Sequence, residues 1–242
     1  MEAILEKTES GAILYDRSIL NHISDAHFRP DGWHAATPVQ GRLRSAGRGS
    51  TMIVSDGERE FVLRHYRRGG MVSRVNRDRY LWRGEKHTRA FSEWRLLARL
   101  IDMGLAVPRP AAARYQRSGL FYTADLLTVR VPGITPLSVR LAGEPVNEEL
   151  WRRVGLGLRR FHDAGVFHAD LNAYNVQLTA DDNLFLLDFD RGELRPPGRW
   201  QQENLARLHR SLRKLKRLDP ALHFSEADWH AAMNAYRMPQ PA

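Results

Sequence analysis

The stretch HADLNAYNVQL, residues 168–178, carries an aspartate, Asp170, and five positions later an asparagine, Asn175, in a run with no other charge. A second run, LFLLDFD at residues 184–190, follows closely and places Asp188 directly after four apolar residues. The segments NVQLT and NLFLLD are separated by turn-forming residues, so they are predicted to form a short β-hairpin. Such a hairpin brings Asp170, Asn175 and Asp188 to one end of two short strands. The sequence therefore predicts a cluster of oxygen-bearing side chains at this place.

These three groups are the ones that phosphoryl transfer requires. A carboxylate orients the attacking hydroxyl and accepts its proton, and hard oxygen ligands hold the Mg²⁺ that bridges the nucleotide phosphates. In this interpretation Asp170 is the catalytic base, and Asn175 and Asp188 are the metal ligands. The pattern H-x-D-x-x-x-x-N followed by D-F resembles the protein-kinase-like signature, which adds His168 to the catalytic candidates. The plainer alternative is that these residues only cap a turn and end two strands.

The first half of the chain carries candidates for the nucleotide-binding part of such a site. The segment GRLRSAGRGST, residues 41–51, fits G-x-G-x-x-G poorly, but its place before a predicted hairpin favours a phosphate loop. Backbone N–H groups at Gly47 and Gly49 are the candidates there. Arg64 stands at the place of the usual strand lysine, and an arginine keeps its charge and binds phosphate or carboxylate in a bidentate way. Glu93, on the next predicted helix, is its expected partner.

The pattern of strands and helices changes along the chain and predicts two lobes. Strands are expected at 50–55, at 59–66 and on both sides of 118–119, and helices at 87–104, 147–165, 199–218 and 225–237. A connection with Pro and Gly, residues 131–136, separates the two kinds of pattern. The prediction is an α+β, protein-kinase-like bilobal fold. Its N-terminal lobe, 1–131, is mainly antiparallel sheet plus one helix and binds nucleotide phosphate, and its C-terminal lobe, 132–242, is mainly helical and holds the catalytic loop and acceptor site.

Composition and length are those of an ordered globular protein. The 242 residues are 43% hydrophobic and 27% charged, without an evident repeat or low-complexity tract. The absence of cysteine excludes disulfides, thiolate metal sites and a cysteine nucleophile. The first residues, MEAILEKTES, lack the basic flank and apolar core of a signal peptide, and no apolar run approaches a membrane span. The expectation from these features is a cytosolic protein.

The formal net charge of +9 indicates an anionic partner, which charge alone does not identify. Basic residues gather in two stretches, 64–89 and 207–217, and the ordinary interpretation of such stretches is a solvated face. The tryptophans are scattered with no basic residues interleaved, so no nucleic-acid partner is predicted. In the helix expected at 199–218, the leucine face formed by residues 205, 208, 212 and 215 is expected to pack inside the C-terminal lobe. The alternative is a helix that lies on a membrane.

Five runs of sequence carry a specific resemblance over most of the chain. They are VLRHYRRGG at 62–70, RDRYLWRGEKHTRAFSEWRLL at 77–97, VPRP at 107–110, FHDAGVFHADLNAYNV at 161–176 and LLDFDRG at 186–192. Together they resemble the 3-deoxy-D-manno-octulosonic acid (Kdo) kinases of the lipopolysaccharide core kinase family. The resemblance implies phosphorylation of the 4-hydroxyl of Kdo on a Kdo-bearing lipid A precursor, with ATP and Mg²⁺. It also implies a peripheral protein at the cytoplasmic face of a Gram-negative inner membrane, whose basic residues bind the anionic acceptor and the anionic bilayer.

Two other functions fit the same residues. A different small-molecule kinase, such as a heptose or aminoglycoside-type phosphotransferase, would use the same Asp170, Asn175 and Asp188. A kinase-like binding module without activity would explain Arg64 in place of lysine and Asp190 in place of glycine. The presence of the base and both metal ligands argues for an enzyme. Oligomeric state is not indicated by any of these patterns.

Overall fold

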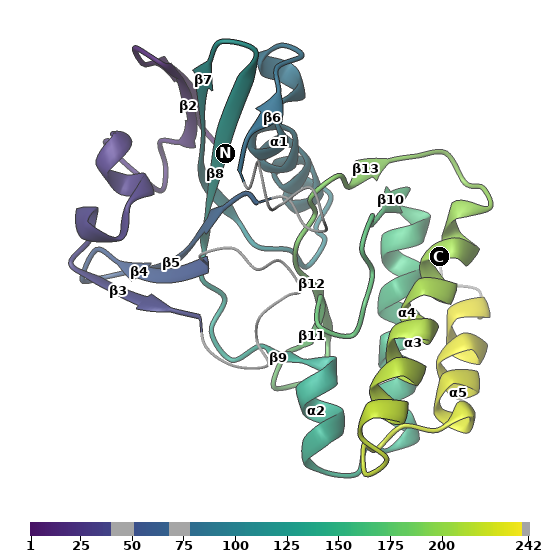
Figure 1. Cartoon of the computed structure of the whole chain (residues 1–242). Helices are drawn as coiled ribbons and strands as arrows, with labels where there is room; N and C mark the ends of the chain where they lie inside the picture. Colours follow the sequence, from purple (N-terminus) through teal and green to yellow (C-terminus); the bar gives the residue numbers. More distant parts are fainter. Residues whose placement is uncertain (40–50, 68–77, 239–242) are drawn as a thin grey trace. The chain divides into compact units, whose positions relative to one another are not determined.

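The structure is a computed structural model that describes residues 1–39, 51–67 and 78–238. The chain divides into two compact units (Figure 1), which are unit 1, Met1–Asp102 with Pro108–Val131, and unit 2, Met103–Val107 with Pro132–Ala242. The lobes expected from the sequence differ from these units in the assignment of Met103–Val107. This segment belongs to unit 2, in which the Ala106 carbonyl accepts a hydrogen bond from the Leu186 N–H at 3.1 Å. The functions expected of the two lobes stay predictions.

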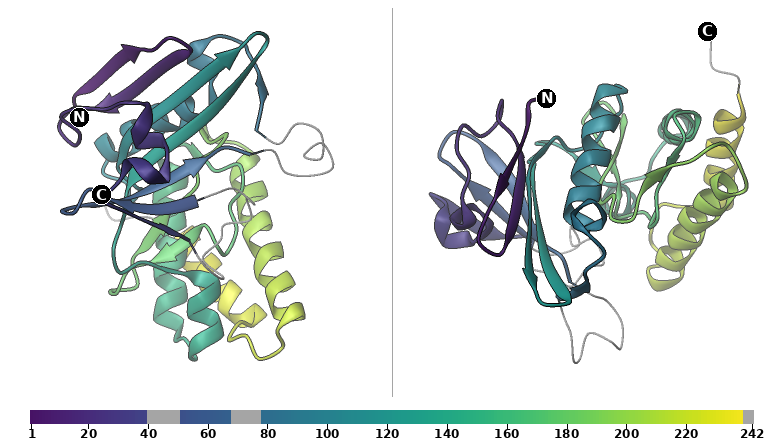
Figure 2. Two further views of the ribbon diagram at one scale, coloured as in Figure 1. Left: turned by 60° about the vertical axis from the view of Figure 1, so that its left-hand side comes forward. Right: turned by 90° about the horizontal axis from the view of Figure 1, so that it is seen from above.

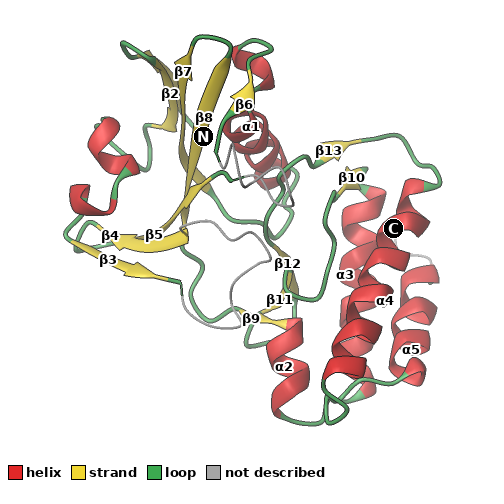
Figure 3. Ribbon diagram, in the orientation of Figure 1, coloured by secondary structure: helices red, strands yellow, loops and turns green. Residues whose placement is uncertain are grey.

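Unit 1 is built on one eight-stranded antiparallel sheet. Its strands are β1 (Ala3–Lys7), β2 (Gly11–Asp16), β3 (Ala35–Pro38), β4 (Thr51–Ser55), β5 (Glu60–His65), β6 (Tyr80–Leu81), β7 (Pro110–Ser118) and β8 (Phe121–Val129). Their order is β1-β2-β7-β8-β5-β4-β3, with β6 paired to β8, so that the hairpin of β1 and β2 forms one edge (Figures 2 and 3). The two hairpins expected here are confirmed, because β4 pairs with β5 and β7 pairs with β8.

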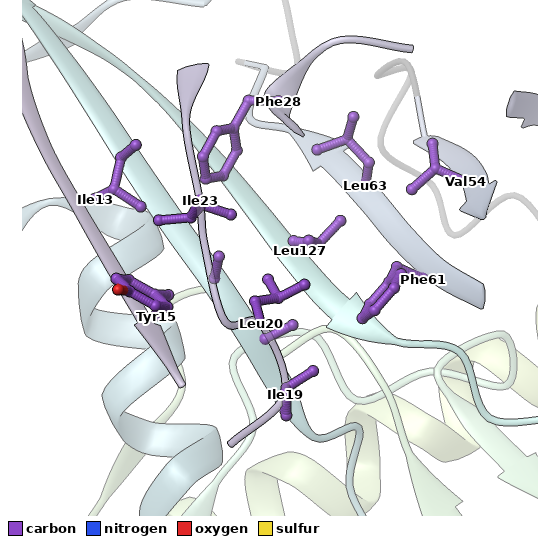
Figure 4. Close-up of a cluster of buried hydrophobic side chains, with 12 residues drawn as sticks. Ile13, Tyr15, Ile19, Leu20, Ile23, Phe28, Val54, Phe61, Leu63 and Leu127 are labelled. Atoms are coloured by element: carbon purple, nitrogen blue, oxygen red, sulfur yellow. The ribbon is translucent and has the colours of Figure 1, made fainter. Parts of the chain in front are cut away.

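One face of this sheet carries an apolar core (Figure 4). Its buried side chains come from the strands and from the segment that contains the 3-10 helix η1 (Asp25–Phe28), and they are Ile13, Tyr15, Ile19, Leu20, Ile23, Phe28, Val54, Phe61, Leu63, Ala111, Ala112 and Leu127. Side chains alternate between the two faces of a strand. Because Phe61 and Leu63 of β5 enter this core, Arg64 lies on the opposite face of the sheet.

Helix α1 (Arg89–Asp102) lies in contact with β7 and β8 in unit 1. Four residues form a buried apolar stripe at helical spacing, and they are Ala90, Trp94, Leu97 and Leu100. Burial of each large apolar side chain contributes about 1.5–3 kcal/mol, so this stripe fixes the helix on the sheet. Ile101, which follows Leu100 in the helix, is partly exposed. The helix ends close to the predicted position, and Gly104 follows it with φ +71°.

Unit 2 is mainly helical and contains two small sheets. Its helices are α2 (Leu137–Gly143), α3 (Glu148–Asp163), α4 (Trp200–Leu218) and α5 (Glu226–Arg237), and its strands are β9 (Thr135–Pro136), β10 (Val166–Phe167), β11 (Val176–Leu178), β12 (Leu184–Leu186) and β13 (Glu193–Leu194). The hairpin predicted after the opening motif is confirmed, since β11 and β12 pair in antiparallel register. Strand β9 joins β11, and β10 pairs with β13. The α+β fold class is therefore confirmed.

Helix α4 has one apolar and one basic face. Leu205, Leu208 and Leu212 are buried, and Leu215 is partly buried. The prediction that the leucine face packs inside the C-terminal part of the chain is thus confirmed. Across the described ranges, no helix combines the length and the apolar character needed to cross a membrane.

Close packing of α3 on α5 depends on Gly155. A Cβ atom added there would lie 2.0 Å from the Ala232 carbonyl oxygen and 3.1 Å from the Ala235 Cβ atom. Gly155→Ala is therefore expected to lower the free energy of unfolding by about 1–3 kcal/mol, the usual cost of overpacking. Thermal and denaturant unfolding measure this change.

Gly143, at the end of α2, provides the matched control. A Cβ atom at this glycine has no described neighbour within 4 Å. Gly143→Ala is expected to leave stability unchanged or to raise it slightly, because alanine is the better helix former. Equal unfolding midpoints for the Gly155 and Gly143 variants would contradict the packing argument.

Candidate active site

The loop between β10 and β11 is shaped by Asn172. Its Oδ1 atom accepts hydrogen bonds from the N–H groups of Tyr174, at 2.8 Å, and Asn175, at 3.1 Å. Its Nδ2 atom donates to the backbone carbonyl and to the Oδ2 atom of Asp170, both at 3.1 Å. An asparagine that bonds the backbone two residues on is typical of tight turns. Asn172 was not singled out from the sequence, although its place between two functional candidates is a signal for such a turn.

The predicted base, Asp170, has an accessible carboxylate. Its side chain is 47% exposed, and its Oδ1 atom lies 3.5 Å from the Nη1 atom of Arg207. Its Oδ2 atom is held by Asn172. The carboxylate is thus oriented by the loop and still open to an incoming hydroxyl, as a general base requires.

His168 holds the loop from inside unit 2. The residue is 1% exposed, and its Nε2 atom lies 2.9 Å from the Leu187 carbonyl oxygen. Because a carbonyl only accepts, Nε2 carries the proton, and Nδ1 accepts from the Asp170 N–H at 3.2 Å. Burial lowers the pKa of His168, which keeps the ring neutral. We therefore interpret His168 as a positioning residue that joins Asp170 to the segment before Asp188, rather than as a group that contacts a substrate.

Asn175 presents an unsatisfied oxygen. The residue is 1% exposed, and its Nδ2 atom donates to the Asp170 carbonyl at 2.9 Å. Within the described part of the chain, its Oδ1 atom is buried and has no hydrogen-bond partner. Leaving a buried acceptor unpaired costs about 1–3 kcal/mol, and a bound cation would satisfy it. The oxygen therefore fits the predicted role of a metal ligand.

Leu187, which lies between β12 and Asp188, connects Asp188 to Asn175 through backbone hydrogen bonding. The Leu187 N–H donates to the Asn175 carbonyl at 3.0 Å, while the Leu187 carbonyl accepts from His168. Asp188 has φ +62°, a left-handed conformation that is uncommon for a residue other than glycine. Strained conformations of this kind are frequent at functional sites. The backbone thus connects both predicted metal ligands to the loop that carries the base.

Asp190 stands where the kinase signature has glycine, and its backbone conformation does not require a glycine. Among the described residues of this turn, Asp188 and Arg191 have positive φ, at +62° and +59°, and Asp190 does not. Glycine is required only where φ is positive or where space is too small for a Cβ atom. The departure at Asp190 therefore leaves the local backbone compatible with the predicted site.

Helix α4 anchors the catalytic loop at two points. The Asn204 side chain accepts from the His168 N–H at 3.1 Å and donates to the His168 carbonyl at 3.0 Å. Further along the helix, the Ser211 hydroxyl accepts from the Ala173 N–H at 3.2 Å. Asn204 is 2% exposed and lies beside the leucines of the helix, where a polar residue signals a buried hydrogen bond. Neither anchor was singled out from the sequence.

In unit 1, the predicted pairing of Arg64 with Glu93 is confirmed. The Arg64 Nη2 atom donates to the Glu93 Oε2 atom and also, at 2.9 Å, to the Tyr66 hydroxyl, which itself donates to Glu93 Oε2 at 2.5 Å. Glu93 is 3% exposed, and burial raises the pKa of Tyr66 well above its usual value. Tyr66 was missed because an aromatic residue in a strand is ordinarily interpreted as part of a core. Gly47 and Gly49 lie outside the described residues.

The fold and this loop define a protein-kinase-like phosphotransferase. The sequence profile of the lipopolysaccharide kinase (Kdo/WaaP) family matches residues 37–236. The chain therefore belongs to the lipopolysaccharide kinase (Kdo/WaaP) family, and the resemblance drawn from the sequence is confirmed.

Relatives of this chain cover most of its length. It is 46% identical over 210 residues, 85% of this chain and 82% of the other, to a 3-deoxy-D-manno-octulosonic acid kinase of Xanthomonas campestris. It is 43% identical over 213 residues, 87% of this chain and 84% of the other, to a protein of the same name from Xylella fastidiosa. Among solved structures, a crystal structure of WbdD matches with a TM-score of 0.46 and 14% identity, over 86% of this chain and 46% of that chain. The chain thus spans less than half of the length of WbdD.

Proposed function

We propose that this protein is an ATP-dependent kinase that phosphorylates Kdo on a Kdo-bearing lipid A precursor in lipopolysaccharide core biosynthesis. The proposal includes the 4-hydroxyl as the acceptor group, as the resemblance implies. Relatives named Kdo kinase, at 46% and 43% identity over most of the chain, support Kdo as the sugar that is phosphorylated. The observation that carries the proposal is the accessible carboxylate of Asp170, held in one loop with the unsatisfied oxygen of Asn175.

Each residue of the loop has a proposed role. Asp170 orients the acceptor hydroxyl and accepts its proton, and Asn172 and His168 hold Asp170 in place. Asn175 and Asp188 would hold Mg²⁺, which when bound neutralises charge on the nucleotide phosphates. Among the described residues, no group of three His, Cys, Asp or Glu side chains is arranged to hold a metal ion. A set of one carboxylate and one amide still fits Mg²⁺, because this ion keeps several waters and takes phosphate oxygens as further ligands.

The proposal also places the protein at the cytoplasmic face of the inner membrane as a peripheral protein. The exposed basic face of α4 supports it, with Arg207, Arg210, Arg213, Lys214 and Arg217. Each cation close to an anionic bilayer contributes about 1 kcal/mol of attraction. Binding to vesicles with and without anionic lipid, at several salt concentrations, tests this localisation.

Transfer of labelled γ-phosphate from ATP with Mg²⁺ tests the activity. The acceptors are a Kdo-bearing lipid A precursor and a heptose-bearing acceptor, with a reaction lacking acceptor as the blank. Label on the Kdo acceptor, located by analysis of the phosphorylated sugar, is the expected result. Label on the heptose acceptor instead would assign a different sugar kinase, and nucleotide binding without any transfer would favour a binding module.

Arg64 is proposed to bind nucleotide phosphate while it pairs with Glu93. Arg64→Ala is expected to raise the KM for ATP by about 10- to 100-fold, the range of a lost charge-assisted hydrogen bond. Arg64→Lys keeps the charge with a different geometry, so its KM is expected to rise less. Steady-state kinetics with ATP as the varied substrate measure both changes.

Arg130 offers a control for the Arg64 variants. It also pairs with a residue of β5, because its Nη1 atom lies 2.7 Å from the Glu60 Oε2 atom, but both side chains are exposed. Exposed ion pairs contribute little, so Arg130→Ala is expected to leave the KM for ATP unchanged. An unchanged KM in the Arg64 variants would remove Arg64 from the phosphate site.

A further inference from the structure

Arg207 is the cation beside the predicted base. Its Nη1 atom lies 3.5 Å from the Asp170 Oδ1 atom, a distance longer than a good hydrogen bond, and its side chain is 48% exposed. A guanidinium carries five N–H donors in a fixed fork. The contact with Asp170 therefore leaves donors of Arg207 directed to solvent, next to the carboxylate that receives the acceptor hydroxyl.

The position of Arg207 relative to Asp170 is fixed by its helix. Asn204, which precedes it in α4, holds the His168 backbone through two hydrogen bonds. Ser211, which follows it in the same helix, holds the Ala173 N–H at 3.2 Å. Arg207 thus lies between two anchors that join α4 to the loop, and a group placed in this way is preorganised for binding.

Arg207 also begins a stripe of exposed cations. Residues spaced by three or four lie on one face of a helix, and this stripe continues through Arg210, Lys214 and Arg217 over about 15 Å of helix axis. In the described ranges, none of these three has an ion pair, whereas Arg213 lies 3.4 Å from Glu226. Unpaired cations of this kind attract an anionic molecule toward Asp170.

We propose that Arg207 binds the carboxylate of an acid-sugar acceptor and thereby orients the sugar so that its acceptor hydroxyl lies at Asp170. This inference rests on the proposed function and names the residue that selects its substrate. An arginine recognises a planar carboxylate with two parallel hydrogen bonds, which adds geometry to charge. A neutral sugar offers no such group, so Arg207 favours Kdo over heptose.

The test compares two acceptors in three proteins. The acceptors are the Kdo-bearing lipid precursor and its carboxamide, which has the same shape without the negative charge. The proteins are wild type, Arg207→Gln and Arg237→Gln. Arg207→Gln is expected to lower kcat/KM for the acid acceptor by about 10- to 100-fold, mostly through KM. Wild type is expected to lose a similar factor with the carboxamide. Arg237→Gln, at an exposed position of α5 outside the basic face of α4, is expected to behave as wild type.

The proposal is tested by whether the effects of Arg207→Gln and of the carboxamide acceptor are additive. If Arg207 binds the carboxylate, Arg207→Gln adds little to the loss that the carboxamide already causes, because both changes remove one interaction. Equal slowing of both acceptors would overturn the proposal and leave Arg207 a role on Asp170 or on a lipid phosphate. An unchanged KM for the acid acceptor would overturn it as well.

Binding without nucleotide separates this inference from the proposed function. Titration of the acid acceptor into each protein is expected to show weaker binding to Arg207→Gln than to wild type. If wild type binds and phosphorylates the acid acceptor and the variant does so equally well, the inference fails alone. If wild type neither binds nor phosphorylates it, the proposed function fails and the inference with it.

Discussion

Asp170→Ala is expected to lower the rate of phosphoryl transfer by about 10²- to 10⁴-fold, the range for loss of a general base. The carboxylate is 47% exposed and held by Asn172, so its removal deletes the group that orients the acceptor and leaves the surrounding backbone in place. Nucleotide affinity is expected to stay close to that of wild type, because Asp170 is not among the proposed phosphate and metal ligands. Acceptor-dependent turnover and nucleotide titration measure the two quantities.

Two further variants separate the chemistry of Asp170 from its surroundings. Asp170→Asn keeps the shape and the contact with Asn172 but removes most of the basicity, so its loss is expected to approach that of the alanine variant. Asp181→Asn changes an exposed aspartate in the turn between β11 and β12 and is expected to keep full activity. Turnover that survives both Asp170 variants would show that another group serves as the base.

The elements that the sequence predicted are those with a strong local pattern. The hairpin of β4 and β5 has β-rich runs on both sides of a DGE turn, and α1 has an apolar stripe at helical spacing that is buried against the sheet. Two of the elements that were missed, β3 and α2, have weak patterns. Strand β3 is AATP, with two alanines and a proline, and α2 is LSVRLAG, with only seven residues. Their structure depends on neighbours in the sheet or helix layer rather than on their own sequence.

In the site, too, the residues that belong to a motif were predicted, and the residues that belong to no motif were missed. Asp170, Asn175 and Asp188 were predicted because their types and spacing match a chemistry. Asn204 was missed because its partner is the backbone of His168, 36 positions earlier in the chain. A backbone group has no sequence signature, so contacts of this kind become visible only in the folded chain.

The pair of Arg64 and Glu93 was predicted from the sequence, whereas the third residue in contact with it was not. Their residue types and their order in the chain indicated an ion pair, and the structure contains it. The third member, Tyr66, lies two positions from Arg64, directly after β5, where alternation makes the two side chains neighbours. That proximity follows from strand geometry, but the hydroxyl's role follows only from the position of α1.

Asp188→Asn is expected to reduce activity by at least about a hundredfold, because it removes the negative charge of the proposed metal ligand pair and with it several kcal/mol of electrostatic stabilisation. The concentration of Mg²⁺ that gives half-maximal activity is expected to rise. A second readout does not depend on turnover: Mg²⁺ with nucleotide at about 100 times its Kd stabilises a protein by about 2.7 kcal/mol, and the variant is expected to lose most of this shift.

Asp182 supplies the matched control for Asp188. Both are aspartates with a left-handed backbone, at φ +56° and +62°, and asparagine tolerates that conformation well. Asp182→Asn therefore makes the same chemical change in the same backbone geometry, away from the loop that contains Asn175. It is expected to keep the activity and the stabilisation by Mg²⁺ with nucleotide. If Asp188→Asn behaved like Asp182→Asn in both measurements, the left-handed conformation of Asp188 would be a feature of the turn alone, and the metal would have to be held by other oxygens.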